Sequence, residues 1–310
     1  MNKKMYVVLV ISLIFGVGNC TGKSSFYKKM KAFFCGNVLE KVYQEEFCAA
    51  SLDMLSLNAI NGSIVIKSGP KKSLFLKTIQ RAKKEDDLNA MQVIVDTHVN
   101  NHLSITTKDN SKKMRGSVDY ELIVPTSLDL ALTVSGKGNV YIKDVHGIIQ
   151  VVAQDAIVIT NTKELVSAQT LKKGSITVIN AVGPVEAYSQ QGTIRGENIA
   201  NSFDAHSIKG KINVVYKKLP TTSLIKLKTV SGNITLALPA DTNAEICGYT
   251  TQGTLLSEHD ITLKPYTTKL NKSAWNKFTK EVNGVLGTGE ATIMLHSTKG
   301  NVKIIQTKTT

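Results

Sequence analysis

Two acidic side chains stand at matching positions of neighbouring sequence repeats. Glu186 and Asp204 are 18 residues apart, and each is the second residue of a short segment that alternates apolar and polar side chains. If the repeats stack as coils of a β-structure, both carboxylates lie on its outside, about 5 Å apart. Two carboxylates that close could hydrolyse a glycosidic bond or, with a cation, carry out elimination on a uronic acid as β-helical polysaccharide lyases do.

The same outward column contains other polar residues. From one repeat to the next it reads Gln150, Ser167, Glu186, Asp204 and Lys226. A lysine beside two carboxylates is typical of a solvated ladder of surface side chains. The pair therefore supports an enzyme only as the alternative interpretation, and we expect no catalytic residue.

The histidines and glycines form no catalytic or metal-binding pattern. His98 and His102 are four residues apart, and four residues of extended strand span about 13 Å, too far for one metal ion. No Ser-His-Asp order or nucleophile elbow is present. Gly284, Gly287 and Gly289 precede a strand-like segment instead of the helix that a phosphate-binding loop requires. The sequence predicts no metal and no cofactor.

A repeat running from residue 138 to residue 236 carries the acidic pair. Segments with the same alternation of apolar and polar residues start at Ile149, Val166, Val185 and Phe203. Successive starts differ by 17, 19 and 18 residues, and a fixed period near 20 is the sequence signature of stacked repeats. Each repeat contains two runs of period 2, which is the period of a strand.

A second pattern interleaves with the first. A glycine followed two residues later by isoleucine or valine occurs at Gly138, Gly174, Gly192, Gly210 and Gly232. The interval from 138 to 174 is two steps, and Asp155 stands in the missing slot. The sequence therefore predicts an all-β fold, a single-stranded parallel β-solenoid with an aliphatic interior. Its inward positions form a file of neighbours, namely Val151, Ala168, Ala187 and Ala205.

Length and composition fit a folded domain and argue against a nucleic-acid partner. The 310 residues are 42% hydrophobic, and the formal net charge is +14 at pH 7. Of the 38 basic residues only three are arginine, the residue that reads phosphates and base edges bidentately. Aromatic residues make up 6%, too few for a base-stacking platform. We expect the lysines on outward faces and sheet edges, where they block aggregation. Attraction to an acidic glycan, a lipid head group or a cell surface is the alternative.

Residues 1–20 read as an export signal of the lipoprotein type. Lys3 and Lys4 precede an apolar run of about 11 residues, too short to span a bilayer. The run ends in Val17-Gly18-Asn19-Cys20, which resembles the bacterial lipoprotein signal and implies lipidation at Cys20. An ordinary cleaved signal and an uncleaved anchor remain as alternatives. The expected location is the cell envelope, with the chain held to the membrane by an N-terminal lipid.

Three further cysteines allow one disulfide. In an oxidising compartment Cys35 and Cys48 could close a short loop that stabilises the fold by about 3 kcal/mol. The alternative is that they are buried thiols, which behave as small hydrophobic residues.

Residues 21–55 show helical spacing. Phe26, Met30, Phe33 and Phe34 predict one or two amphipathic helical turns, broken at residues 36–37. Such a segment could lie on the membrane as a tether or cover the first coil as a cap.

From residue 56 onward the order of motifs resembles a known family. The marks are the strand Gly62-Ser63-Ile64-Val65-Ile66, a charged loop before Leu88, the strand ending at Val124-Pro125, and the coil start Ser231-Gly232-Asn233-Ile234. This order resembles the bacterial putative-adhesin family of β-strand-repeat proteins, over residues 56–305. The resemblance implies a right-handed or closely related parallel β-solenoid, here residues 56–310, and a surface or envelope location. It transfers no catalytic residue.

The sequence thus favours a non-enzymatic envelope lipoprotein that acts as an adhesin or interaction scaffold. We expect its polar faces to contact a surface protein or glycan through side chains such as Tyr141, Tyr188 and Lys226. The alternative is a β-helical lyase or glycosidase. A stress-responsive or sporulation-type signalling domain of the envelope is a third class that the sequence does not separate.

Overall fold

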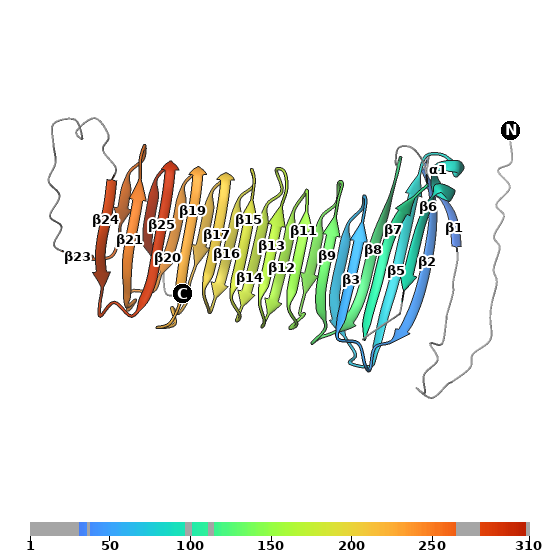
Figure 1. Ribbon diagram of the computed structural model, residues 1–310, viewed down its shortest axis with the longest axis horizontal. Helices are drawn as coiled ribbons and strands as arrows, with labels where there is room; N and C mark the ends of the chain where they lie inside the picture. Colours follow the sequence, from blue (N-terminus) through green and yellow to red (C-terminus); the bar gives the residue numbers. More distant parts are fainter. Residues whose placement is uncertain (1–30, 36–37, 97–100, 111–114, 265–279, 308–310) are drawn as a thin grey trace.

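The computed structural model describes residues 31–35, 38–96, 101–110, 115–264 and 280–307. Nearly all of the regular structure is β, arranged as two 13-stranded sheets, and α1 (Glu85–Ala90) is a short helix beside them. The all-β class predicted from the sequence is confirmed. Figure 1 shows the strands stacked side by side along the long axis of the molecule.

The two sheets take their strands from the whole described chain. In order across the sheet, the first sheet contains β1 (Lys31–Cys35), β2 (Val38–Cys48), β5 (Ser73–Ala82), β8 (Gly116–Pro125), β4 (Ile64–Gly69), β10 (Val140–Lys143), β12 (Ile157–Thr162), β14 (Ile176–Ala181), β16 (Ile194–Ile199), β18 (Ile212–Val215), β20 (Ile234–Leu238), β26 (Val302–Gln306) and β22 (Leu255–Ser257). The second sheet contains β23 (Thr262–Leu263), β24 (Lys280–Leu286), β21 (Ala244–Thr250), β25 (Ala291–Lys299), β19 (Leu224–Ser231), β17 (Phe203–Lys209), β15 (Val185–Ser189), β13 (Val166–Thr170), β11 (Ile149–Ala153), β9 (Asp129–Val134), β3 (Met54–Ala59), β7 (His102–Asp109) and β6 (Met91–Asp96).

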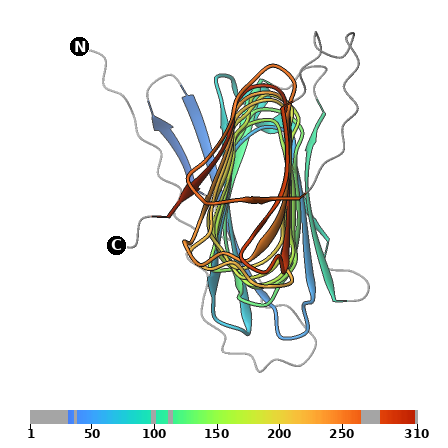
Figure 2. The same ribbon diagram turned by 90° about the vertical axis from the view of Figure 1, so that its left-hand side faces the viewer.

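Between β9 and β20 the chain alternates between the sheets. Each turn of the chain adds one strand to each sheet, parallel to the strand of the preceding turn. Figure 2, along the long axis, shows the sheets facing each other across a narrow interior. The register places Val151 opposite Ala168, Ala168 opposite Ala187, and Ala187 opposite Ala205, so the predicted file of inward residues is confirmed.

The interior follows from the period of 2. In central strands such as β11 and β12, alternate residues face inward and are buried, while their neighbours face outward. One coil alone would leave these aliphatic side chains in water, and only stacking removes them from it. The core is therefore a continuous column between the sheets.

One corner of the coils requires glycine because successive backbones approach closely there. A Cβ atom on Gly192 would lie 1.8 Å from the carbonyl oxygen of Gly174, far inside contact distance. Next to this corner a column of buried hydroxyls faces inward, formed by Thr170, Ser189, Ser207, Thr229, Ser297 and Thr250. These hydroxyls donate to glycine carbonyls, for example Thr170 to Gly174 at 2.8 Å and Ser297 to Gly232 at 2.8 Å.

A second corner uses asparagine. Asp144, Asn161, Asn180 and Asn198 all have φ between 52° and 60°, the left-handed region that asparagine and aspartate tolerate better than other non-glycine residues. Their side chains form a ladder in which each amide donates to the preceding coil, at 2.6 to 2.7 Å. The asparagine ladder therefore joins successive turns of the chain through side-chain hydrogen bonds.

The N-terminal segment differs from its prediction. Instead of helical turns, residues 31–35 and 38–48 form the antiparallel strands β1 and β2, and β2 pairs with β5 along its length. The edge of β5 offers β2 a row of backbone hydrogen-bond partners. These bonds favour a strand more than the helical spacing of the phenylalanines favours a helix. Phe26 and Met30 lie outside the described residues.

The same pairing contradicts the predicted disulfide. Cys35 pairs with Val38 at one end of β2, whereas Cys48 is the last residue at its other end. Ten residues of strand span about 33 Å, but a disulfide requires Cα atoms within about 7 Å. The two cysteines are therefore too far apart to bridge within the chain.

Candidate binding surface

The outer face of the second sheet carries the predicted column of polar residues. The register aligns Gln150, Ser167, Glu186, Asp204 and Lys226 on consecutive strands β11, β13, β15, β17 and β19. Glu186, Asp204 and Lys226 are exposed. The sequence therefore predicted the composition and direction of this column correctly.

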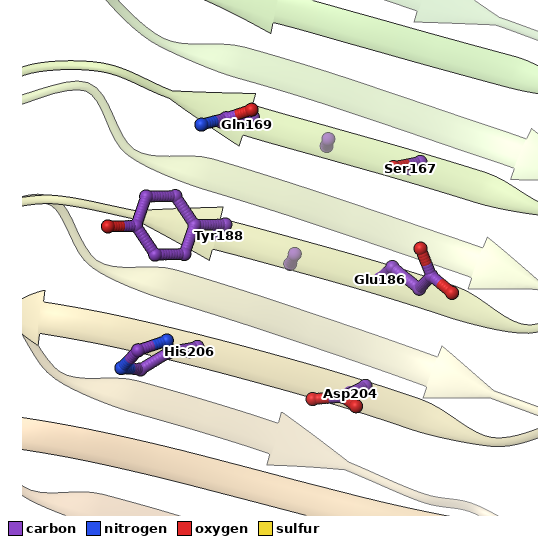
Figure 3. A pocket seen from close by; sticks show the side chains of 8 residues that line it. Ser167, Gln169, Glu186, Tyr188, Asp204 and His206 are labelled. Atoms are coloured by element: carbon purple, nitrogen blue, oxygen red, sulfur yellow. The ribbon is translucent and has the colours of Figure 1, made fainter.

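A second column runs beside it, two residues further along each strand. It consists of Tyr188, His206, Lys228, His296 and Tyr249 on β15, β17, β19, β25 and β21, and we call it the Tyr-His-Lys ladder. The rings of Tyr188 and His206 meet edge to face with centroids 5.4 Å apart, and those of Tyr249 and His296 at 4.8 Å. Figure 3 shows Tyr188 beside His206 and Glu186 beside Asp204.

This ladder was not predicted from the sequence. Tyr188, His206 and Lys228 are spaced by 18 and 22 residues, the same spacing as Gly192, Gly210 and Gly232, so three of its members could have been found. Tyr249 and His296 likewise precede Gly253 and Gly300 by four residues, but the sequence does not show that β25 lies between β19 and β21.

The ladder sets the charge of its histidines. Burial lowers the pKa of His206, the neighbouring Lys228 lowers it further, and Asp204 opposes both effects. Burial and Lys228 likewise lower the pKa of His296. Near neutral pH both rings are therefore uncharged, and each offers one donor and one acceptor nitrogen.

A shallow depression of about 230 Å³ lies between the two columns. Its outward lining is Ser167, Gln169, Glu186, Tyr188, Asp204 and His206 (Figure 3). Sites that enclose a small molecule are usually larger, about 300–1,000 Å³, and mostly apolar. This surface is better suited to an extended ligand that lies across several strands.

The carboxylate pair has the predicted placement but not the surroundings of a catalytic site. Glu186 stands directly opposite Asp204, and both are exposed. A glycosidase shelters its acid in an apolar pocket, whereas Lys226 occupies the next rung here. Among the described residues no three His, Cys, Asp or Glu side chains come together as metal ligands.

The other predicted residues are dispersed. Tyr188 and Lys226 lie on the outer face of the second sheet, but Tyr141 lies on β10 in the first sheet, where it is 42% exposed. The three therefore do not form one site. Cys20 and His98 lie outside the described residues, and His102 bonds to Ser56 at 2.9 Å. No described helix is both long enough and apolar enough to cross a bilayer.

Comparisons with known proteins give distant structural likenesses. No family model matches the chain, and no curated protein matches its sequence. A solved structure of a putative adhesin from Bacteroides fragilis NCTC 9343 is 15% identical with a TM-score of 0.48, over 85% of this chain and 97% of that chain. A putative cell adhesion protein from Clostridium sporogenes ATCC 15579 is 11% identical with a TM-score of 0.26, over 85% of this chain and 99% of that chain. At such low identity, function has to be argued from this chain's own residues.

Proposed function

We propose that the chain is an exported, lipid-anchored, non-enzymatic protein of the cell envelope that acts as an adhesin or interaction scaffold. It binds through the outer faces of a parallel β-solenoid. The observation that carries this proposal is the pair of aligned polar columns on the outer face of the second sheet.

The solenoid supplies a rigid display. Each coil adds one strand to each sheet, so outward side chains recur about every 4.8 Å along the axis. Burial of the inward side chains fixes the register, because a slip of one residue would turn every polar side chain into the core. Surface residues then stand in fixed order without a binding loop.

The lipid would tether one end of the molecule. Lys31, where the described chain begins, is 11 residues after Cys20 (31 − 20 = 11). Eleven extended residues span at most about 40 Å. Because β1 and β2 lie at one end of the long axis (Figure 1), a lipid on Cys20 would hold that end near the membrane and leave the rest projecting.

Labelled palmitate tests the anchor. We expect the wild-type chain in its native host to incorporate the label and Cys20→Ala to lose it. External protease on intact cells should digest the chain if it is displayed outward. An unlabelled wild-type chain would contradict lipid anchoring.

Binding to an array of glycans and matrix proteins tests the scaffold. We expect Tyr188→Ala and Lys226→Gln to weaken binding several-fold while leaving the melting temperature unchanged, because both side chains lie outside the core. Tyr141→Ala, on the outer face of the first sheet, is the matched control that distinguishes binding by one face from binding by the other. If none of the three variants lowers binding, the proposal fails.

The alternative is a polysaccharide-cleaving enzyme that uses Glu186 and Asp204, which the register places opposite each other. This alternative predicts release of sugar or unsaturated uronate, abolished by Glu186→Gln and by Asp204→Asn. Turnover of an acidic polysaccharide by the wild type, lost in these variants, would replace the scaffold proposal.

A further inference from the structure

The Tyr-His-Lys ladder is symmetric about Lys228. A histidine flanks the lysine on each side, on β17 and β25, and a tyrosine stands beyond each histidine, on β15 and β21. Five rungs at about 4.8 Å cover about 19 Å along the molecular axis. Lys228 is exposed, and the four rings are partly exposed with their edges in contact.

The charges beside the ladder are unevenly distributed. Lys226 lies two residues before Lys228 on the same face of β19, so β19 presents two cationic side chains outward. On β25 the corresponding neighbour of His296 is Met294, which is 45% exposed. Within the described part of the chain, acidic groups adjoin the ladder near its two ends and not at its centre.

At the β15 end, Asp204 lies beside His206 on β17, and Glu186 lies on β15. At the other end, Glu281 on β24 pairs with Tyr249. The centre of the ladder, over β19 and β25, is therefore cationic and apolar.

We propose that this ladder binds a linear polysaccharide bearing carboxylates, which lies along the molecular axis with an anionic group over Lys228. The inference rests on the proposed function and names its ligand class. Sugar rings have apolar faces that pack on Tyr188 and Tyr249, and the neutral imidazoles exchange hydrogen bonds with sugar hydroxyls. Lys226 and Lys228 supply charge complementarity.

The direction of the ladder favours a glycan over a peptide. A peptide that recognises a sheet adds as a strand at an edge and bonds through its backbone. The ladder crosses β15 to β21 at right angles to the strands, and the backbone groups of these strands pair within the sheet. Only side chains are available, so the ligand has to be recognised by ring faces, hydroxyls and charge.

The histidines make binding depend on pH. His206 faces Tyr188, Lys228 and Asp204, and His296 faces Lys228 and Tyr249. As pH falls below their lowered pKa values, both rings gain charge and the ladder presents three cationic rungs in succession. A carboxylated polymer remains ionised at about pH 5.5, since free carboxyl groups have pKa values near about 4. Affinity therefore rises as pH falls.

Calorimetry with the full chain and polygalacturonate tests the inference. We expect binding that tightens about tenfold from about pH 7.5 to about pH 5.5, and none to fully methyl-esterified polygalacturonate. Lys228→Gln should raise Kd about fivefold. The double variant His206→Gln, His296→Gln should keep binding at the higher pH and lose its pH dependence. Lys143→Gln, an exposed lysine on the first sheet, is the matched control and should change nothing.

Four outcomes would overturn the ladder site. These are no binding of polygalacturonate, equal losses in Lys228→Gln and Lys143→Gln, unchanged pH dependence in the double histidine variant, and equal affinity for single-stranded oligothymidine. Equal losses would indicate attraction to net charge alone. Array binding that still depends on Tyr188 and Lys226 would keep the scaffold proposal even if polygalacturonate fails to bind. Loss of both signals would remove both proposals.

Discussion

The two ladder histidines link the surface to the stability of the fold. Burial and Lys228 hold the pKa of His206 and His296 below the ordinary value of 6.5, because the charged form is disfavoured in the folded chain. In the unfolded chain neither constraint applies, so the unfolded state binds more protons in mildly acidic solution.

We therefore expect the free energy of unfolding to decrease as the pH is lowered. The contribution of the two histidines is complete above the unfolded pKa of 6.5, and it is lost as pH falls through the lowered folded pKa values. Melting temperature measured from about pH 7.5 to about pH 5 should decline more in the wild type than in the double variant His206→Gln, His296→Gln. Parallel curves for the two proteins would show that other groups dominate.

Successive turns of the chain are joined at their corners in two ways: by close backbone packing at glycines and by hydrogen bonds between asparagine side chains. The glycine repeat was readable in the sequence, including the substitute at residue 155, where the Asp155 carboxylate accepts a bond from the Gly138 amide at 2.9 Å. The asparagine ladder was not predicted, although Asp144, Asn161, Asn180 and Asn198 are spaced by 17, 19 and 18 residues, the same steps as the strand starts of the repeat. Helical spacing was also misleading at Phe33 and Phe34, which lie in strand β1, because the spacing carries no information about the edge of β5 with which β2 pairs.

Gly192→Ala should be strongly destabilising. Its Cβ would meet the carbonyl of Gly174 at 1.8 Å, and backbone cannot move aside without breaking the coil. We expect a loss of at least about 2 kcal/mol in urea unfolding. Gly248→Ala is the matched control, because its Cβ would lie 3.3 Å from a Leu255 side chain that can shift. Similar losses in both variants would contradict the contact argument.

Asn180→Ala should cost less than the glycine change. The substitution removes the hydrogen bond that Asn180 donates to Asn161 and the one that it accepts from Asn198. It also leaves an alanine at a φ of 56°. We expect about 1–2 kcal/mol of destabilisation. Asn180→Gly keeps the backbone conformation and loses only the side-chain bonds, so urea titration should place it between alanine and the wild type. If glycine were no better than alanine, strain would have no part in the effect.

At the scale of the whole molecule, the sequence predicted the centre better than the ends. Period and alternation determine the coils from β9 to β20, where each strand pairs with the strand one turn away. At the C-terminal end β25 lies between β19 and β21, out of chain order, and this order brings His296 and Tyr249 into the ladder. No local pattern encodes such an insertion, because it depends on which edge the returning chain meets.

Stacked coils should unfold from their ends. Each central turn of the chain has two neighbours, whereas among the described residues the short strands β22 and β23 each pair with one strand. Hydrogen exchange should therefore be slowest in β13 to β16 and fastest in β22 and β23. Equal protection throughout would indicate a single cooperative unit.

The out-of-order position of β25 also bears on how the chain is made. β19 and β21 leave the ribosome before β25, yet each pairs with β25 and not with the other. Until β25 has been synthesised, each of the two strands has an unpaired edge on the side that β25 later occupies, and an unpaired strand edge is a template for pairing with another chain. The second sheet therefore becomes continuous across β19, β25 and β21 only when a strand made after both of its neighbours has been inserted between them.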